Sequence, residues 1–268
     1  MIKLICSDID GTLLNAERQL SKKTIAEIGK LKDKLPVILI SSRMPSAMKH
    51  LQKQLNIINH PIVAYNGGLI HINDDIKQST TIPFEIVNKI IDLNEDCLHL
   101  SLYNNDNWFA PQLDHWTERE TNNTKVNPTI KHNNEVLKLW KTHRKGAHKI
   151  MCMGDTKLVT KFYDLLSENF SNDIHLYRSK DTYIEIAPKQ ISKRSAIEFL
   201  IESEFGLNMS EVMSFGDNFN DIEMLEASGL GIAVGNARKE VKHIADKTIE
   251  NAKEDGVANF LNDYFKMS

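Results

Sequence analysis

Short apolar runs that alternate with helical segments are the feature of this sequence that most restricts its fold. Three such runs lie in the first third of the chain, at residues 2–7, 36–41 and 61–65. The stretch 21–34, between the first two runs, carries apolar residues at helical spacing. Strands that are apolar along their whole length are buried on both faces, as in a parallel sheet covered by helices on each side. The pattern therefore predicts an α/β fold.

The middle of the chain departs from this rhythm, which returns in the last third. Between about residues 83 and 187, strand candidates such as 98–103 and 182–186 alternate apolar with polar residues. Such alternation is typical of antiparallel strands with one face in water. We therefore predict a Rossmann-like parallel-sheet core formed by residues 1–82 and 188–268. An inserted α+β domain, residues 83–187, interrupts this core.

Charge and cysteine content argue against several classes of protein. The net charge is −3, whereas broad attraction to nucleic acids or membranes favours a clear basic excess. Cys6, Cys97 and Cys152 form no CxxC pair, so neither a disulfide framework nor a zinc site is indicated. The chain shows no signal-peptide pattern and no apolar run of membrane-spanning length. We expect a cytoplasmic protein without nucleic-acid or membrane partners, and the sequence does not indicate its oligomeric state.

Two acidic residues follow the first apolar run. In LICSDIDGTLL, residues 4–14, Asp8 ends the expected strand and Asp10 lies directly before Gly11. Two carboxylates this close repel each other unless one is protonated or a cation lies between them. A hard cation such as Mg²⁺ prefers carboxylate and carbonyl oxygens. A helix cap or an Asp-Gly turn is the alternative explanation for these residues.

A hydroxyl residue and a lysine occupy two further element ends. Ser41 and Ser42 follow the second apolar run, where free backbone N–H groups can hold phosphoryl oxygens. Lys193 opens a helix, where the helix dipole mildly disfavours a positive charge. A lysine there could neutralise an anion shared with the aspartates. Taken alone, Ser41 also fits a turn residue and Lys193 a surface lysine.

The stretch GDNFND, residues 216–221, places four oxygen-bearing side chains within five positions. Its spacing does not fit a calcium loop. An N-capping cluster would explain Asn220 and Asp221 but not Asp217, which follows a strand. Because ligands bind at the carboxyl ends of the strands in doubly wound sheets, we expect these side chains to face the same site as Asp8.

Taken together and in this order, the motifs resemble those of a known family. DIDGTLL, ILISSR, Lys193 and GDNFND look like the four motifs of the haloacid dehalogenase-like phosphatases. The insert between the second and third motifs is similar to the large α/β cap of the Cof-type subgroup, type IIB. The segment GLGIAVGNARKEVKHIADKTIENAKEDGVANFL, residues 229–261, is also typical of that subgroup.

The resemblance implies a covalent mechanism with a metal ion. Asp8 would be the nucleophile and would form an aspartyl-phosphate. Asp10 would protonate the leaving group and then accept a proton from water. Mg²⁺ would be held by Asp8, the backbone carbonyl of Asp10, and Asp217. Asp221 would act on a metal-bound water or orient the motif lysine.

The resemblance also implies which residues bind the phosphoryl oxygens. These would be Ser41, the backbone at Ser42, Lys193 and Asn220. Asn66 matches the family's Asn-Gly turn after the third strand, and it would lie near the active site and touch substrate. A plain turn is the alternative for Asn66.

Two positions depart from the family pattern. Ser42 and Arg194 each stand where relatives have glycine. Because only glycine adopts a strained backbone freely, we expect Ser42 to alter the geometry of the phosphate loop. Neither departure removes a catalytic group.

The function implied is a Mg²⁺-dependent phosphatase of small phosphorylated metabolites, sugar phosphates foremost, whose cap selects the leaving group. One alternative is a phosphomutase that passes the phosphoryl group to another hydroxyl. A second is a non-catalytic phospho-acceptor switch, like a response-regulator receiver. Receivers lack an acid two residues after the phosphorylated aspartate and have no such insert, so Asp10 and the insert favour hydrolysis.

Overall fold

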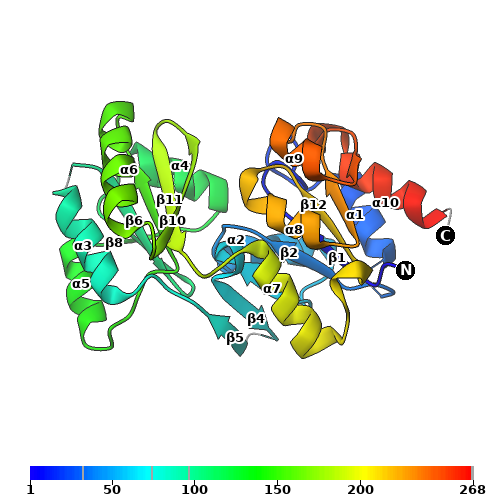
Figure 1. Ribbon diagram of the computed structural model, residues 1–268, viewed down its shortest axis with the longest axis horizontal. Helices are drawn as coiled ribbons and strands as arrows, with labels where there is room; N and C mark the ends of the chain where they lie inside the picture. Colours follow the sequence, from blue (N-terminus) through cyan, green and yellow to red (C-terminus); the bar gives the residue numbers. More distant parts are fainter. Residues whose placement is uncertain (32, 74, 96, 267–268) are drawn as a thin grey trace. The chain divides into compact units, whose positions relative to one another are not determined.

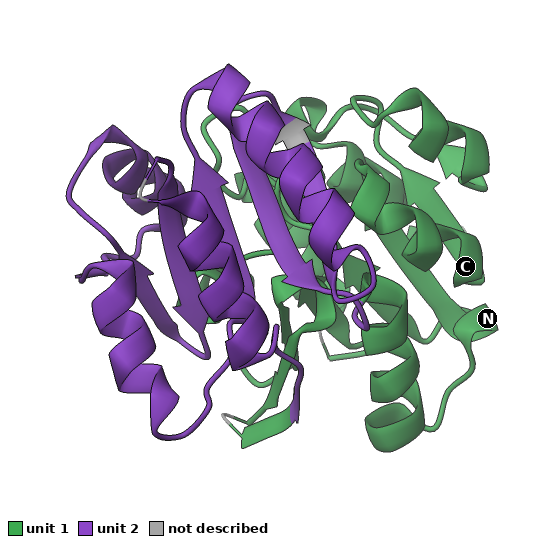
Figure 2. Cartoon of the chain, turned by 60° about the vertical axis from the view of Figure 1, so that its left-hand side comes forward, with its two compact units in different colours: residues 1–77, 192–268 green, residues 78–191 purple. Residues whose placement is uncertain are grey.

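The computed structural model of the protein describes every residue apart from 32, 74, 96, 267 and 268 (Figure 1). The chain forms two compact units: residues 1–77 with 192–268, and residues 78–191 (Figure 2). These bounds differ by a few residues from the predicted insert, 83–187, because the first unit gives way to the second within strand β5 (Asp75–Ser79).

Unit 1, residues 1–77 and 192–268, is built on an eight-stranded sheet with the order β14-β13-β12-β1-β2-β3-β4-β5. Its other strands are β1 (Leu4–Ser7), β2 (Val37–Ile40), β3 (Ile62–Ala64), β4 (Leu69–Ile72), β12 (Val212–Gly216), β13 (Leu230–Ala233) and β14 (Lys247–Thr248). Strand β1 pairs in parallel with β12 and β2, and every residue of β1 is buried. The predicted α/β class with a parallel core is confirmed. Strand β4, which pairs antiparallel with β3 at this edge of the sheet, was not predicted.

Two groups of helices pack along this sheet. They are α1 (Lys22–Leu31), α2 (Ser46–Leu55) and α10 (Gly256–Lys266) in one group, and α7 (Lys193–Leu200), α8 (Ile222–Ala227) and α9 (Lys239–Ile244) in the other. Connections between parallel strands are right-handed. From β1 the chain moves across the sheet through β2 to β3, whereas from β12 it moves through β13 to β14 in the opposite direction. The two groups therefore cover opposite faces, and the strand ends between them stay open to a site.

Unit 2, residues 78–191, contains a six-stranded sheet with the order β10-β11-β9-β6-β7-β8. Its elements are α3 (Phe84–Asn94), β6 (His99–Asn104), β7 (Asn107–Ala110), α4 (His115–Thr124), β8 (Thr129–Ile130), α5 (Asn133–Lys141), β9 (Lys149–Met153), α6 (Thr156–Phe170), β10 (Ile174–Lys180) and β11 (Tyr183–Pro188). The long strands pair antiparallel, as predicted, and among the described residues of this sheet only β7 and β8 pair in parallel. One face of the sheet forms an apolar core with α3, α5 and α6.

The wet face that the alternation predicted is absent at β6 but partly present at β11. His99, Ser101 and Tyr103 of β6 are buried, whereas Tyr183 and Glu185 of β11 are half-buried and alternate with buried isoleucines. His99 bonds to Ser101 Oγ at 2.9 Å and to Asp114 at 2.9 Å, and Trp108 Nε1 donates to Ser101 Oγ at 3.0 Å. These hydrogen bonds satisfy side chains that would otherwise be costly to bury.

Across the described part of the chain, no helix combines the length and apolarity that a membrane span requires.

Candidate active site

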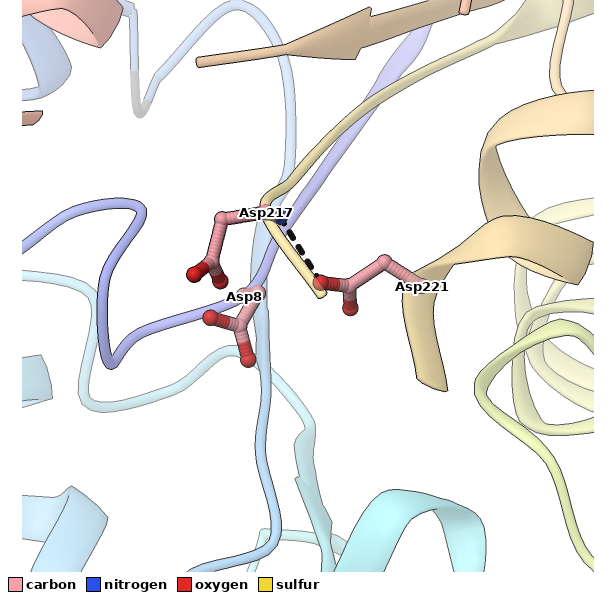
Figure 3. A group of neighbouring side chains, drawn as sticks. All are labelled: Asp8, Asp217 and Asp221. Carbon is pink, nitrogen blue, oxygen red and sulfur yellow. Dashed lines mark hydrogen bonds between the residues drawn. The ribbon is translucent and has the colours of Figure 1, made fainter. Parts of the chain in front are cut away.

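Asp8 lies where β1 leaves the centre of the unit 1 sheet. Its backbone N–H donates to the carbonyl of Phe215 on β12, and the Ser7 hydroxyl donates to the Asp8 carbonyl. The parallel register pairs Ser7 with Phe215, so the chain leaves both strands at the same edge. Asp8 and Asp217 therefore meet there, as expected, and Figure 3 shows their carboxylates close together.

Three carboxylates gather at this edge. One oxygen from each of Asp8, Asp217 and Asp221 lies within 4.8 Å of the others. Burial raises the pKa of Asp8 well above its usual range; Lys193 opposes this shift, and the charges of Asp221 and Asp217 add to it. Burial, followed by the Asp221 charge, raises the pKa of Asp217 to about 6. Concentrated negative charge of this kind favours a bound cation.

Lys193, the first residue of α7, is fully buried and bridges two of these acids. Its Nζ lies 2.5 Å from Asp8 Oδ1 and 2.6 Å from Asp221 Oδ1. Burial lowers the pKa of Lys193, but Asp221 and Asp8 outweigh it and hold the pKa above its ordinary value. Lys193 is therefore no surface lysine. Its single positive charge faces three carboxylates.

Asp221 uses both of its oxygens on the protein itself. Oδ1 accepts from Lys193, and Oδ2 accepts from the backbone N–H of Asn218 at 3.0 Å. Oδ2 also accepts from the backbone N–H of Asp217 at 2.9 Å, the hydrogen bond drawn in Figure 3. A Cβ on Gly216 would lie 2.5 Å from the Asp221 Cβ, so this loop closes tightly around the aspartate. The contacts favour an orienting role for Asp221, one of the two that the resemblance left open.

The residues at this edge fit a divalent metal ion with oxygen ligands. One lysine cannot neutralise three carboxylates, and Mg²⁺ prefers carboxylate oxygens. Thr12 Oγ1 donates to Asp217 Oδ1 at 3.2 Å and helps to orient that carboxylate. Gly11 has φ +91°, and a Cβ there would lie 2.4 Å from Asp217 Oδ2. The Asp-Gly step therefore clears the space that Asp217 occupies.

Asp10 stands outside the three-carboxylate cluster and contacts two arginines. Arg43 donates from Nε to Oδ2 at 2.6 Å and from Nη2 to Oδ1 at 2.8 Å. Arg18 Nη2 adds a third hydrogen bond, to Oδ1, at 2.6 Å. Burial raises the pKa of Asp10, but Arg43 and then Arg18 outweigh it and hold the pKa below its usual range. The side chain of Asp10 is thus separate from the group that could hold the metal.

The candidate phosphate-binding residues lie on neighbouring turns. The backbone N–H of Asn66 donates to the Ser41 carbonyl at 2.8 Å, and Asn220 Nδ2 donates to Asn66 Oδ1 at 3.1 Å. Asn66 is buried, has φ 56° and lies in the turn that joins the antiparallel strands β3 and β4, so the hairpin turn that the sequence allowed is present. The structure brings Ser41, Asn66 and Asn220 together.

The two departures from the family pattern have little effect on this geometry. Ser42 lies outside the left-handed region, so the expectation of a strained backbone there is wrong and this position does not require glycine. Arg194 is half exposed and pairs with Glu198 one turn along α7, at 2.7 Å. It does not contact the carboxylate cluster.

Sequence reasoning missed four residues that hold the site together. Arg43 and Thr12 were present only as unassigned residues of the second and first motifs, and Arg18 lies four residues after the first motif. Asn236 Nδ2 donates to the Gly11 carbonyl at 2.7 Å from a position 225 residues away. No local pattern predicts such long-range contacts.

The raised pKa of Asp217 makes a prediction about stability without metal. The folded protein holds this proton up to about pH 6, whereas the unfolded chain releases it near the ordinary pKa of 3.8. The contribution of Asp217 to folding stability therefore falls as pH rises from about 4 to 6. In metal-free protein at pH 7, Asp217→Asn should melt at a higher temperature than wild type, and the difference should shrink near pH 4. Thermal unfolding with EDTA measures this, with the exposed Asp263→Asn as control. A lower melting temperature for Asp217→Asn at pH 7 would contradict the charge account.

Comparison with known proteins places the whole chain in one family. Residues 5–261 match the family model of the haloacid dehalogenase-like hydrolases. A Haemophilus influenzae relative named "Putative phosphatase" is 32% identical over 272 residues, covering 99% of both chains. A Bacillus subtilis relative named "5-amino-6-(5-phospho-D-ribitylamino)uracil phosphatase YitU" is 29% identical over 272 residues, covering 98% of both. The solved structure of the subclass IIB sugar phosphatase BT4131 shares the fold, with a TM-score of 0.81 and 22% identity over 98% of each chain.

These matches confirm the membership that the four motifs predicted, together with the enzyme class. The relatives are covered almost from end to end, so the agreement includes the segment that forms unit 2. The chain belongs to the haloacid dehalogenase-like hydrolases.

Proposed function

We propose that this protein is a Mg²⁺-dependent phosphatase that hydrolyses small phosphorylated metabolites through a phosphoryl group carried on Asp8. The observation that supports this most strongly is the contact of buried Asp8 with Lys193, beside Asp217 and Asp221. A buried carboxylate held by a lysine beside two further acids is far from its ordinary state. Perturbed groups of this kind cluster at functional sites.

In the first step, an Asp8 oxygen attacks phosphorus and the bond from phosphorus to the leaving oxygen breaks. Arg43 and Arg18 keep Asp10 ionised when no substrate is bound, so Asp10 must take up a proton as the substrate binds, and it gives this proton to the leaving oxygen. In the second step, the ionised Asp10 takes a proton from the attacking water, and the Asp8 carboxylate leaves phosphorus. Asp10 thus regains the proton that it gave to the leaving group.

Charge compensation is the main demand of phosphoryl transfer. Lys193 supplies one fixed positive charge, and Ser41 and Asn220 supply donors for the phosphoryl oxygens, with Asn66 orienting Asn220. The Ser42 backbone lies on the same turn as Ser41. A Mg²⁺ held by Asp8, Asp217 and the Asp10 carbonyl would neutralise further charge on the phosphoryl group and the nucleophile.

The substrate class we propose is a phosphate ester on a polyhydroxylated carbon chain, such as a sugar phosphate. The name of the Bacillus subtilis relative describes such an ester, on a ribityl chain. Unit 2 would act as a cap that selects the leaving group. A panel of phosphorylated sugars, cofactors and nucleotides, assayed for released phosphate, tests the class. Transfer to an added sugar instead of to water would favour a phosphomutase.

Removal of metal should abolish activity reversibly. With EDTA, hydrolysis of p-nitrophenyl phosphate should stop, because like charges at the carboxylate cluster then oppose binding of the phosphoryl dianion. Excess Mg²⁺ should restore the rate fully. The measurement is nitrophenol release before chelation, after it, and after Mg²⁺ is added back. Unchanged turnover in EDTA would remove the metal from the proposal.

A further inference from the structure

The side chain of Arg43 is fixed far more firmly than an arginine in a loop requires. It is only 6% exposed, although it follows the turn at Ser41. Its Nη1 donates to the carbonyl of Ala47, in the first turn of α2, at 3.3 Å. Its backbone N–H donates to Ser41 Oγ at 3.2 Å. The guanidinium is therefore anchored to a helix, and its backbone to the candidate phosphate loop.

The remaining donors of Arg43 form a fork on Asp10. Nε and Nη2 reach different oxygens of the carboxylate, at 2.6 and 2.8 Å. Paired bonds of this geometry fix the rotation of a carboxylate as well as its place. Arg18, by contrast, makes one contact to Asp10, and its side chain is 49% exposed. Arg43 is thus the fixed partner of Asp10, and Arg18 the weaker one.

We propose that Arg43 is a positioning residue that aims Asp10 at the leaving oxygen in the first step and at the attacking water in the second. This inference rests on the proposed function. Arg43 touches neither reacting atom in this role and acts only through Asp10. Because its backbone belongs to the Ser41 turn, it ties the proton-transfer group to the loop that binds the phosphoryl oxygens. A misplacement of about 1 Å can lower the rate of such a step by on the order of 10²-fold.

A double-mutant cycle distinguishes this role from a structural one. Arg43→Ala should lower the steady-state kcat for an alkyl phosphate such as glycerol 2-phosphate by on the order of 10²-fold, with little change in KM. In an Asp10→Asn background the same change should cost almost nothing further, because the group it positions is already lost. Effects that multiply in the double variant would overturn the proposal, as would an Arg43→Ala enzyme with wild-type kcat.

The leaving group gives a second, independent readout. Nitrophenolate departs without a proton, so the first-turnover burst with p-nitrophenyl phosphate should stay near the wild-type rate in Arg43→Ala. The following steady state should slow, because hydrolysis of the phosphoenzyme still needs Asp10. Equal slowing of burst and steady state would assign Arg43 a general structural role instead.

Two further variants serve as controls, one for the loss of the Arg43 charge alone and one for the removal of an arginine outside the site. Arg43→Lys keeps the positive charge but cannot form the paired bonds to Asp10. Its kcat should therefore be lower than the kcat of Arg43→Ala measured with added guanidinium ion. Arg144→Gln removes an exposed arginine that pairs with Glu85, and it should leave kcat unchanged. If wild type forms a phosphoenzyme but the cycle is additive, only this inference fails. If no phosphoenzyme forms in wild type, the proposed function itself fails.

Discussion

Replacing Asp8 with asparagine should lower the turnover of p-nitrophenyl phosphate by on the order of 10⁴-fold or more. An amide has no ionised oxygen to attack phosphorus, so the covalent route closes. The fold should survive, because Lys193 keeps its 2.6 Å contact with Asp221. Loss of one buried carboxylate also relieves repulsion in the cluster. We therefore expect an inactive protein that melts no lower than wild type at pH 7.

The matched control is Asp263→Asn, which removes an exposed carboxylate from α10 of the same unit. It should keep full activity. Steady-state nitrophenol release and thermal unfolding, measured on all three proteins, complete the comparison. Undiminished turnover in Asp8→Asn would end the covalent mechanism, whereas loss of folding in that variant would contradict the account of the charges.

Asp10→Asn should have a different defect from that of Asp8→Asn. The nucleophile remains, and nitrophenolate leaves without help, so the first step should still occur. The second step lacks its base, so phosphorylated enzyme should accumulate close to one phosphoryl group per chain. Intact mass spectrometry after an acid quench should show an adduct of about 80 Da, the mass of one HPO₃ group.

The control for this adduct is the double variant Asp8→Asn/Asp10→Asn, which should show none. Wild type should show little, because it hydrolyses the intermediate. An Asp10→Asn enzyme that turns over at the wild-type rate without an adduct would show that another residue, or solvent, carries the proton.

Much of the sheet and of the carboxylate site could be predicted because both follow from local patterns. The apolar run 2–7 makes a buried strand, and Asp8 stands at its end. The stretch GDNFND repeats the arrangement after β12. Since β1 and β12 are parallel neighbours, the rule that ligands bind at strand ends brings Asp8 and Asp217 together.

Elements without an apolar signal were missed. Helix α4, with the sequence HWTERETNNT, buries Thr117 and Thr124 in place of aliphatic residues, so it shows no apolar stripe. Asp114, which accepts from the N–H groups of Trp116 and Thr117, was its clearest sign. Strand β5, DIKQS, is largely exposed and polar, so it lacks the apolar residues by which the other strands were recognised.

The arginine contacts of Asp10 illustrate a different limit of sequence reasoning. Asp10 and Arg43 are 33 positions apart and come from two separate loops. Each loop could be placed at the same sheet edge, but the Arg43 rotamer that makes the fork also donates to the Ala47 carbonyl of α2, a contact outside both motifs. A pattern of residue types does not encode that choice.

Mapping the phosphoryl group in Asp10→Asn tests the central claim most directly. Trypsin should release residues 4–18 as one peptide, with Asp8 as the expected site. Borohydride reduces an acyl phosphate to an alcohol, so reduction before digestion should convert Asp8 alone to homoserine. The account predicts homoserine at position 8, and no conversion in the double variant. A phosphoryl group on any other residue, or no modified peptide despite nitrophenol release, would contradict it.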